Sequence, residues 1–329
     1  MLFTDIHLGL KTNSEMHNQD CLQFVEWMSE LAKKEGCETC IFLGDYHNNR
    51  ATMNIRTMHY AVQCLEHLSR NFSQTFFITG NHDQFFKDKR DVQSVEWAKH
   101  IPNITVINDF FNEGNVTLLP WLVGGEHSSI KKIKSQYMFG HFELPSFLMN
   151  ASIVMPDHGD IKNSFFSNIG HVFSGHFHKR QQKENITYIG NCFPHNFGDA
   201  NDDERGCAIL EWGKEAEFHA WPGQPLYRIY QLSDILVNTE KLLLPKMYVK
   251  ANIDVNISYE ESSFVKETLL SKYELRELTL VPGKPTELNE PSVVNINFKS
   301  VDTIVMEQIG AIDSDVYDPK ILLEIYKNL

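Results

Sequence analysis

The stretch TFFITGNHD, residues 75–83, decides the fold, because an apolar run ends there in a glycine that polar residues follow at once. A short run of aromatic and β-branched residues that ends in a glycine is typical of a buried strand. The run TCIFLGD, residues 39–45, has the same arrangement, and helix-spaced apolar residues precede the two runs at 21–32 and 58–68. Strands that alternate with helices predict an α/β fold with a site at the carboxyl ends of its strands.

Metal-competent side chains follow such runs in five short segments: DIH (5–7), GDYH (44–47), GNHD (80–83), GH (140–141) and GHFH (175–178). Further strand-like runs lie at 104–107, 116–119, 137–139 and 171–174. The five segments offer carboxylates, imidazoles and one amide but no thiolate, a set that suits manganese, with iron or zinc as alternatives. Eight such groups are too many for one ion, whereas a shared carboxylate lets two ions lie roughly 3.5–4 Å apart. A single Gly-His pair is more often a turn beside a packed histidine, but five segments in this order argue against chance.

The order of these motifs, over residues 5–178, resembles the calcineurin-like metallophosphoesterases. Within them the chain looks like the nuclease subunits of double-strand-break repair complexes: bacterial SbcD, the eukaryotic meiotic-recombination-eleven nuclease and, most of all, their T4-type phage counterpart. The matching stretches are TGNHD (79–83), FGHFEL (139–144), SGHFH (174–178), YIG (188–190) and GDANDDERG (198–206). This resemblance implies an α/β two-sheet sandwich flanked by helices (αββα), with a small α+β capping domain and a C-terminal helical tail.

The resemblance also implies a role for each motif residue. Two divalent ions, Mn²⁺ or alternatively Mg²⁺, would be held by two sets of ligands: Asp5, His7 and His178, and Asn81, His141 and His176. Asp45 would bridge the ions. His82 would be catalytic, stabilising the pentacoordinate phosphorus or protonating the leaving oxygen as an activated water attacks in line. His47 would be the second catalytic histidine, one position closer to Asp45 than in cellular members.

On this resemblance, the function is a two-metal-dependent DNA nuclease (exonuclease or endonuclease) that processes DNA ends in recombination and repair. It would work with an SMC-like ATPase subunit, as a homodimer within a heterotetramer; the chain has no P-loop motif, so the ATPase is a separate chain.

One alternative is a metal-dependent phosphatase or phosphodiesterase for a small-molecule or protein substrate. The protein serine/threonine phosphatases carry GDxVDRG, whereas DYHNNR (45–50) lacks the second acid and has its arginine one residue late. Another alternative, a metal-dead scaffold, is disfavoured because no expected ligand is missing.

Proline and glycine divide the chain at WPGQP (221–225) and from PGKP (282–285) to Pro291. We therefore expect three domains: a metallophosphoesterase nuclease domain over 1–222, a capping domain that positions DNA over 226–281, and ATPase-docking helices over 292–329. In the capping domain the patterns predict a strand at 247–255, a helix at 262–273 and a strand at 275–281. In the tail, Asp318 and Pro319 predict a helix start. One face of that helix carries Ile321, Leu322, Ile325 and Tyr326, and it would dock on the ATPase or fold back on its own domain.

Composition limits the remaining possibilities. The 329 residues include 30 basic and 43 acidic side chains, for a net charge of −13, which excludes a globally basic nucleic-acid coat but not a local basic patch. Candidate patches are 87–90, 131–134 and 179–180. We expect no membrane span or secretory signal, and six reduced cysteines, which together predict a cytoplasmic protein, in the host if phage-encoded. The CETC stretch (37–40) is interpreted as a helix end that leads into a buried strand and not as a zinc ribbon.

Overall fold

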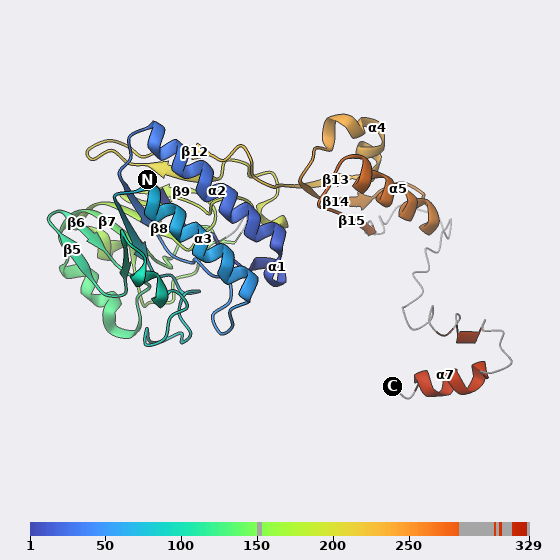
Figure 1. Cartoon of the computed structure of the whole chain (residues 1–329), viewed down its shortest axis with the longest axis horizontal. Helices are drawn as coiled ribbons and strands as arrows, with labels where there is room; N and C mark the ends of the chain where they lie inside the picture. The colour runs from blue at the N-terminus through green and yellow to red at the C-terminus, as the bar shows by residue number, and fades with distance from the viewer. Residues whose placement is uncertain (150–152, 283–305, 307–308, 311–317, 328–329) are drawn as a thin grey trace. The chain divides into compact units, whose positions relative to one another are not determined.

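A computed structural model describes residues 1–149, 153–282, 306, 309–310 and 318–327 (Figure 1). The chain forms two compact units, Met1–Gly283 and Lys284–Leu329. In the first unit, two six-stranded sheets and one three-stranded sheet are present among the described residues. The mixed α/β architecture with paired sheets and flanking helices is the one expected from the sequence.

The first sheet follows the order β12 (Glu217–Ala220), β11 (Gly206–Ile209), β1 (Leu2–Phe3), β2 (Thr39–Phe42), β3 (Gln74–Ile78) and β4 (Ile104–Ile107). The second follows β5 (Phe111–Glu113), β6 (Val116–Leu118), β7 (Ser135–His141), β8 (Ile169–Gly175), β10 (Ile186–Tyr188) and β9 (Gln181–Lys183). Neighbouring strands from β1 to β4 are parallel, as are β6, β7, β8 and β10, while the other pairs are antiparallel. All six strand-like runs named from the sequence are strands.

The alternation of side chains along β2 shows how the layers assemble. Cys40 and Phe42 belong to a core shared with helices α2 (Glu15–Lys34) and α3 (Ile55–Asn71). Ile41 belongs to a different core, which includes Phe139 of the second sheet. Because successive side chains of a strand point to opposite faces, one short run serves both layers. The two sheets therefore pack face to face, with α2 and α3 on the outer face of the first (Figure 1).

Short helical turns connect these elements: α1 (Leu10–Asn13) and the 3₁₀ segments Glu96–His100, Gly124–Lys132, Asn163–Phe166 and Phe197–Asp199. The helix expected at 21–32 is the longer α2, and the one expected at 58–68 is α3. All six cysteines are free, and Cys40 is buried in β2 a few residues after α2 ends. The CETC stretch thus joins a helix to a buried strand, as expected.

The segment after the first two sheets forms a third sheet, with parallel strands β13 (Leu226–Gln231), β14 (Met247–Ile253) and β15 (Glu277–Pro282). Helices α4 (Leu232–Leu242) and α5 (Tyr259–Lys272) connect them, and the segment has a hydrophobic core of its own. The predicted β-α-β unit is confirmed, with β13 and α4 added before it. Arg276 joins this segment to helix α2, because its Nη2 donates a hydrogen bond to Asp20 Oδ1 at 2.6 Å.

The second unit contains helix α7 (Pro319–Lys327). Asp318 Oδ1 accepts a hydrogen bond from the backbone N–H of Lys320 at 2.8 Å, which is the predicted N-cap. Most of the predicted docking segment before Asp318 lies outside the described residues. Among the helices that the structure describes, none is long and apolar enough to cross a membrane.

Candidate metal centre

The five motifs converge at the carboxyl ends of strands from both sheets. The first sheet supplies Asp5, His7, Asp45 and Asn81, which follow β1, β2 and β3, and the second supplies His141, His176 and His178, at the ends of β7 and β8. The sheets are joined here directly, because the backbone N–H of His176 donates to Asp5 Oδ2 at 3.0 Å. Parallel strands place their carboxyl ends at one edge, which is why segments remote in sequence meet there.

Backbone conformation and close packing shape this edge. Left-handed φ angles occur at Asp5 (51°), His7 (48°), Asp45 (62°) and His176 (89°). Non-glycine residues rarely adopt this conformation, and strain of this kind clusters at functional sites. Gly44 has φ 103°, and a Cβ there would lie 2.5 Å from His141 Nδ1. A Cβ at Gly80 would collide with the Asp45 carboxylate, so both strand-end glycines are required by the side chains around them.

One group of ligand atoms surrounds His7. Its Nε2 lies 3.7 Å from Asp5 Oδ1, 3.6 Å from Asp45 Oδ2 and 3.3 Å from His178 Nε2. His178 Nε2 is also 3.8 Å from Asp5 Oδ1. Four nitrogen and oxygen ligands at such separations fit one divalent ion, since metal–ligand bonds near 2.1 Å place ligand atoms roughly 3–4 Å apart.

The second group surrounds Asn81. Its Oδ1 lies 3.1 Å from His141 Nε2 and 3.0 Å from His176 Nδ1. The other nitrogen of His141, Nδ1, is 2.7 Å from the Leu43 carbonyl, and a carbonyl only accepts, so Nδ1 carries the proton. The Nε2 lone pair is therefore left for a metal, an orientation that metal-binding histidines commonly have.

Asp45 links the two groups, because its Oδ2 is 3.6 Å from His7 Nε2 and 3.4 Å from His141 Nε2. Its Oδ1 accepts the backbone N–H of His82 at 2.8 Å. The His82 ring meets the His7 ring edge-on at 4.8 Å, and His82 Nδ1 is 2.7 Å from the Asn48 carbonyl. All of the predicted ligands and His82 are thus brought together around one buried carboxylate.

Electrostatics at the centre follow from this packing. Burial alone would raise the pKa of Asp45, but the charges of His141 and His7 hold it well below its usual range. Burial opposes the proton on His141, yet Asp45 raises the pKa of that imidazole to about 9. Burial lowers the pKa of His178 to about 4 in spite of Asp5. A metal ion takes the place of the protons that such carboxylate–imidazole contacts hold.

Asp83, the last residue of GNHD, has a structural role that its motif position did not reveal. The carboxylate is fully buried and accepts four backbone N–H groups, from Gly80 (2.9 Å), Asp45 (3.0 Å), Tyr46 (2.9 Å) and His47 (3.2 Å). Burial and the neighbouring Asp45 raise the pKa of Asp83 to about 7. The carboxylate therefore ties the loop after β3 to the loop after β2.

His47 makes its side-chain hydrogen bond outside this cluster. Its ring is 1% exposed, its Nδ1 is 2.9 Å from Ser94 Oγ, and burial lowers its pKa to about 3. None of the three metal-competent groups found among the described residues includes it. Its Nε2 is buried and has no hydrogen-bond partner among the described residues, and a catalytic role for His47 stays a prediction.

Two residues beside the centre were not assigned a role from the sequence. Glu143 Oε2 lies 3.0 Å from His176 Nε2 and orients that imidazole. Its signal in the sequence was its place in the matching stretch FGHFEL (139–144), two residues after His141. The second is His195, which is buried beside His7 and His178 and carries no motif signal.

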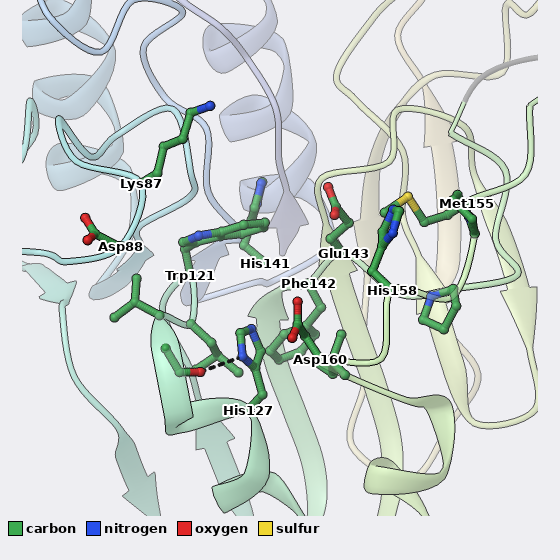
Figure 2. Close-up of a pocket in the computed structure, with 16 residues that line it drawn as sticks. Lys87, Asp88, Trp121, His127, His141, Phe142, Glu143, Met155, His158 and Asp160 are labelled. Carbon is green, nitrogen blue, oxygen red and sulfur yellow. Dashed lines mark hydrogen bonds between the residues drawn. The ribbon is translucent and has the colours of Figure 1, made fainter.

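A cavity of about 330 Å³ opens next to the second ligand group (Figure 2). His141, Glu143 and Trp121 line it, with Lys87 at one side. The Trp121 ring lies 5.2 Å from the His176 ring. Of the candidate basic patches, Arg90 is already bonded to Glu126 by its Nη1 and Nη2, at 2.5 and 2.6 Å.

No family model matches the chain. Exonuclease subunit 1 of Enterobacteria phage T4 is 29% identical over 207 residues, 60% of this chain. The chain resembles a phage nuclease subunit. The match confirms the resemblance predicted from the five motifs, and this chain spans about 60% of that relative's length. The crystal structure of Pseudomonas putida nuclease MPE aligns with 54% of this chain and 60% of its own, at 18% identity and a TM-score of 0.28.

Proposed function

We propose that this chain is a two-metal-dependent DNA nuclease. The observation that carries the proposal is the position of Asp45, whose Oδ2 lies 3.6 Å from His7 Nε2 and 3.4 Å from His141 Nε2. One carboxylate between two imidazole groups suits a pair of ions with a shared ligand. The partial match to a protein named exonuclease subunit 1 supports a nuclease over a phosphatase.

In this proposal, Asp5, His7, His178 and Asp45 would hold one ion, and Asp45, Asn81, His141 and His176 would hold the other. Mn²⁺ suits this mixture of imidazole and oxygen ligands, with Mg²⁺ as the alternative. When bound, such ions supply an activated water and charge stabilisation at the phosphate. The remaining chemistry belongs to the chain's own side chains.

His82 is the proposed proton donor to the leaving oxygen. Its Nδ1 proton is donated to the Asn48 carbonyl at 2.7 Å, so the neutral ring presents only a lone pair at Nε2. A proton can leave from Nε2 only when the ring is an imidazolium. Burial lowers the His82 pKa and Asp45 opposes that shift, so we expect this step to weaken as the pH rises.

The other parts of the chain are proposed to bring substrate and partner to this centre. Residues 226–281 would position DNA, and residues 292–329 would dock on an SMC-like ATPase. Two copies of each chain would form a heterotetramer in the cytoplasm. In α7, Ile321 and Ile325 are 57% and 55% exposed, which supports docking because apolar anchors four residues apart suit a helix that lies in a groove. A DNA strand end would lie over the cavity beside Trp121, where a base can stack.

A substrate panel tests the proposal. The full chain is assayed with Mn²⁺, Mg²⁺ or EDTA on linear duplex DNA, single-stranded DNA, a phosphodiester chromogen and a phosphomonoester chromogen, with and without a purified SMC-like ATPase. We expect metal-dependent release of nucleotides and cleavage of the diester. Hydrolysis of the monoester without any cleavage of DNA would favour the phosphatase and reject the nuclease.

A further inference from the structure

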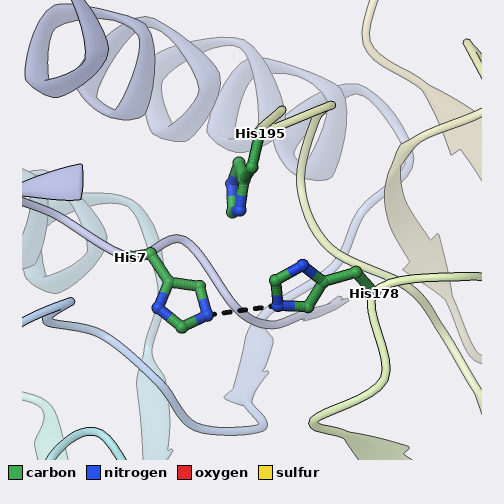
Figure 3. A group of neighbouring side chains, drawn as sticks. All are labelled: His7, His178 and His195. Atoms are coloured by element: carbon green, nitrogen blue, oxygen red, sulfur yellow. Dashed lines mark hydrogen bonds between the residues drawn. The ribbon is translucent and has the colours of Figure 1, made fainter. Parts of the chain in front are cut away.

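His195 is a buried histidine that the proposed mechanism leaves unused. It lies in the loop after β10, and its side chain is directed toward the rings of His7 and His178 (Figure 3). The centroid of the His195 ring lies 5.5 Å from that of the His7 ring and 5.3 Å from that of the His178 ring, and both pairs of rings meet edge-on. One ligand atom from each of the three residues lies within 4.8 Å of the other two.

Both ring nitrogens of His195 are buried and have no hydrogen-bond partner among the described residues, and the residue is 2% exposed. A neutral imidazole carries one donor and one acceptor, and leaving both unpaired away from water is unfavourable. His17, next to it at 5.4 Å between ring centroids, differs, because its Nε2 is 3.0 Å from the His7 carbonyl. Packing alone therefore explains His17 but not His195.

The backbone of His195 is fixed by buried polar contacts. Its N–H donates to Asp199 Oδ2 at 2.9 Å, and its carbonyl accepts from the Tyr227 hydroxyl at 2.9 Å. Asp199 is in turn bound by Arg205, whose Nη2 lies 3.1 Å from Asp199 Oδ1. An imidazole on so constrained a backbone is pre-organised toward the metal centre.

We propose that His195 is a third imidazole ligand of the ion that Asp5, His7 and His178 hold. This inference rests on the proposed two-metal function and deepens it. With the shared Asp45, the first ion would have three imidazoles and two carboxylates, whereas the second would have two imidazoles, an amide and the shared carboxylate. Imidazole-rich sites favour Mn²⁺, Fe²⁺, Co²⁺ and Zn²⁺ over Mg²⁺, so the first site would select a transition-metal ion.

Metal titration tests the assignment. Wild type, His195→Phe and the control His171→Phe are titrated with Mn²⁺ by calorimetry and electron paramagnetic resonance, after circular dichroism confirms folding without metal. His171 stacks on Tyr137, with ring centroids 5.3 Å apart, and it is in none of the metal-competent groups found among the described residues. We expect the control to match wild type. His195→Phe should lose affinity for one ion by at least about tenfold, the loss that even an outer-shell partner causes, and should lose preference for Mn²⁺ over Mg²⁺.

A measurement on the wild-type chain keeps the inference testable if the variant does not fold. Loaded with Co²⁺, the protein should show paramagnetically shifted imidazole N–H resonances from five histidines, His195 among them. Shifted resonances from only four histidines would overturn the inference and leave the two-metal function intact. So would a folded His195→Phe variant that binds both Mn²⁺ ions with the affinities of the wild type. A wild-type chain that binds no metal would instead reject the proposed function itself.

Discussion

Asp83 offers the sharpest test of how the fold supports the centre. Its fully buried carboxylate accepts four backbone N–H groups from the loops that carry Asp45 and His82. Asp83→Ala would leave all four donors without this acceptor. Each such bond to a charged group contributes about 1.5–3 kcal/mol. Water entering the new cavity recovers part of the loss, and so does removal of the buried charge, because the raised pKa of Asp83 shows that burying this charge costs stability above pH 7. We therefore expect the free energy of unfolding to fall by about 3–5 kcal/mol.

Asp83→Asn separates charge from shape. The amide keeps one oxygen, which still accepts two N–H groups, but its NH₂ faces the other two donors. We expect roughly half of the loss caused by alanine. Both variants should also lose about 100-fold in nuclease activity, because displacing Asp45 by about 1 Å misplaces the reacting groups.

The assay is thermal unfolding in EDTA at pH 8, above the pKa of about 7 that burial and Asp45 give Asp83. EDTA removes any contribution from bound metal. A loss of 3–5 kcal/mol should lower the Tm by about 10 °C in a chain of this size. The control is Asp109→Ala, which removes an exposed carboxylate that accepts one N–H, from Phe110 at 2.9 Å, and it should change stability by no more than about 0.5 kcal/mol. If Asp83→Ala and Asp109→Ala have the same Tm, the Asp83 carboxylate does not hold the two loops together and the reasoning is wrong.

Four further changes have defined outcomes. Asp45→Asn should lose one of two bound ions and lower Mn²⁺-dependent activity by orders of magnitude while circular dichroism stays unchanged, so wild-type activity would contradict the shared-ligand model. His82→Ala should keep both ions by plasma emission yet lose turnover, and a loss of metal would make His82 a ligand. Because burial lowers the His47 pKa from 6.5 to about 3, the unfolded chain binds the extra proton, and this residue should cost about 1.4 kcal/mol of stability per pH unit as the pH falls below 6. His47→Gln should flatten that loss in urea unfolding with EDTA, and a His47 pKa near 6.5 by NMR would refute the effect. Truncation after Pro291 should spare Mn²⁺-dependent cleavage of short substrates but abolish co-purification with the ATPase. Unchanged binding of the ATPase would instead favour a tail that folds back on its own domain.

The strands that carry the site were predictable because their sequence is nearly determined by burial. In β2, both faces are covered from Cys40 to Phe42, so these residues are apolar. At Gly44, which follows, His141 leaves no room for a side chain. The edge strands were not predictable. β9, at the edge of its sheet, has the sequence QQK, and none of these residue types favours a strand. It is a strand because it pairs with β10.

The same distinction divides the site residues. Ligands such as Asp5 and His141 stand at strand ends, where local sequence fixes both position and direction. His195 and Glu143 depend on tertiary structure instead. His195 reaches the centre only because buried contacts to Asp199 and Tyr227 hold its loop there, and the role of Glu143 depends on the ring of His176. No local pattern contains such information.

Because the proposed ligands come from both sheets, metal binding would depend on assembly of the sandwich. Asp5 and Asp45 stand on the first sheet and His141 and His176 on the second, so an ion held by both groups binds the packed sandwich and not the separated layers. A ligand that binds only the folded state stabilises it by RT ln(1 + [L]/Kd), about 2.7 kcal/mol at a hundredfold excess over Kd. Without metal, the charges of Asp45 and His141 still attract each other across the sheets. Charge thus already holds the sandwich together at the edge where the proposed ions would bind, which explains how backbones as strained as these can be ready for an ion.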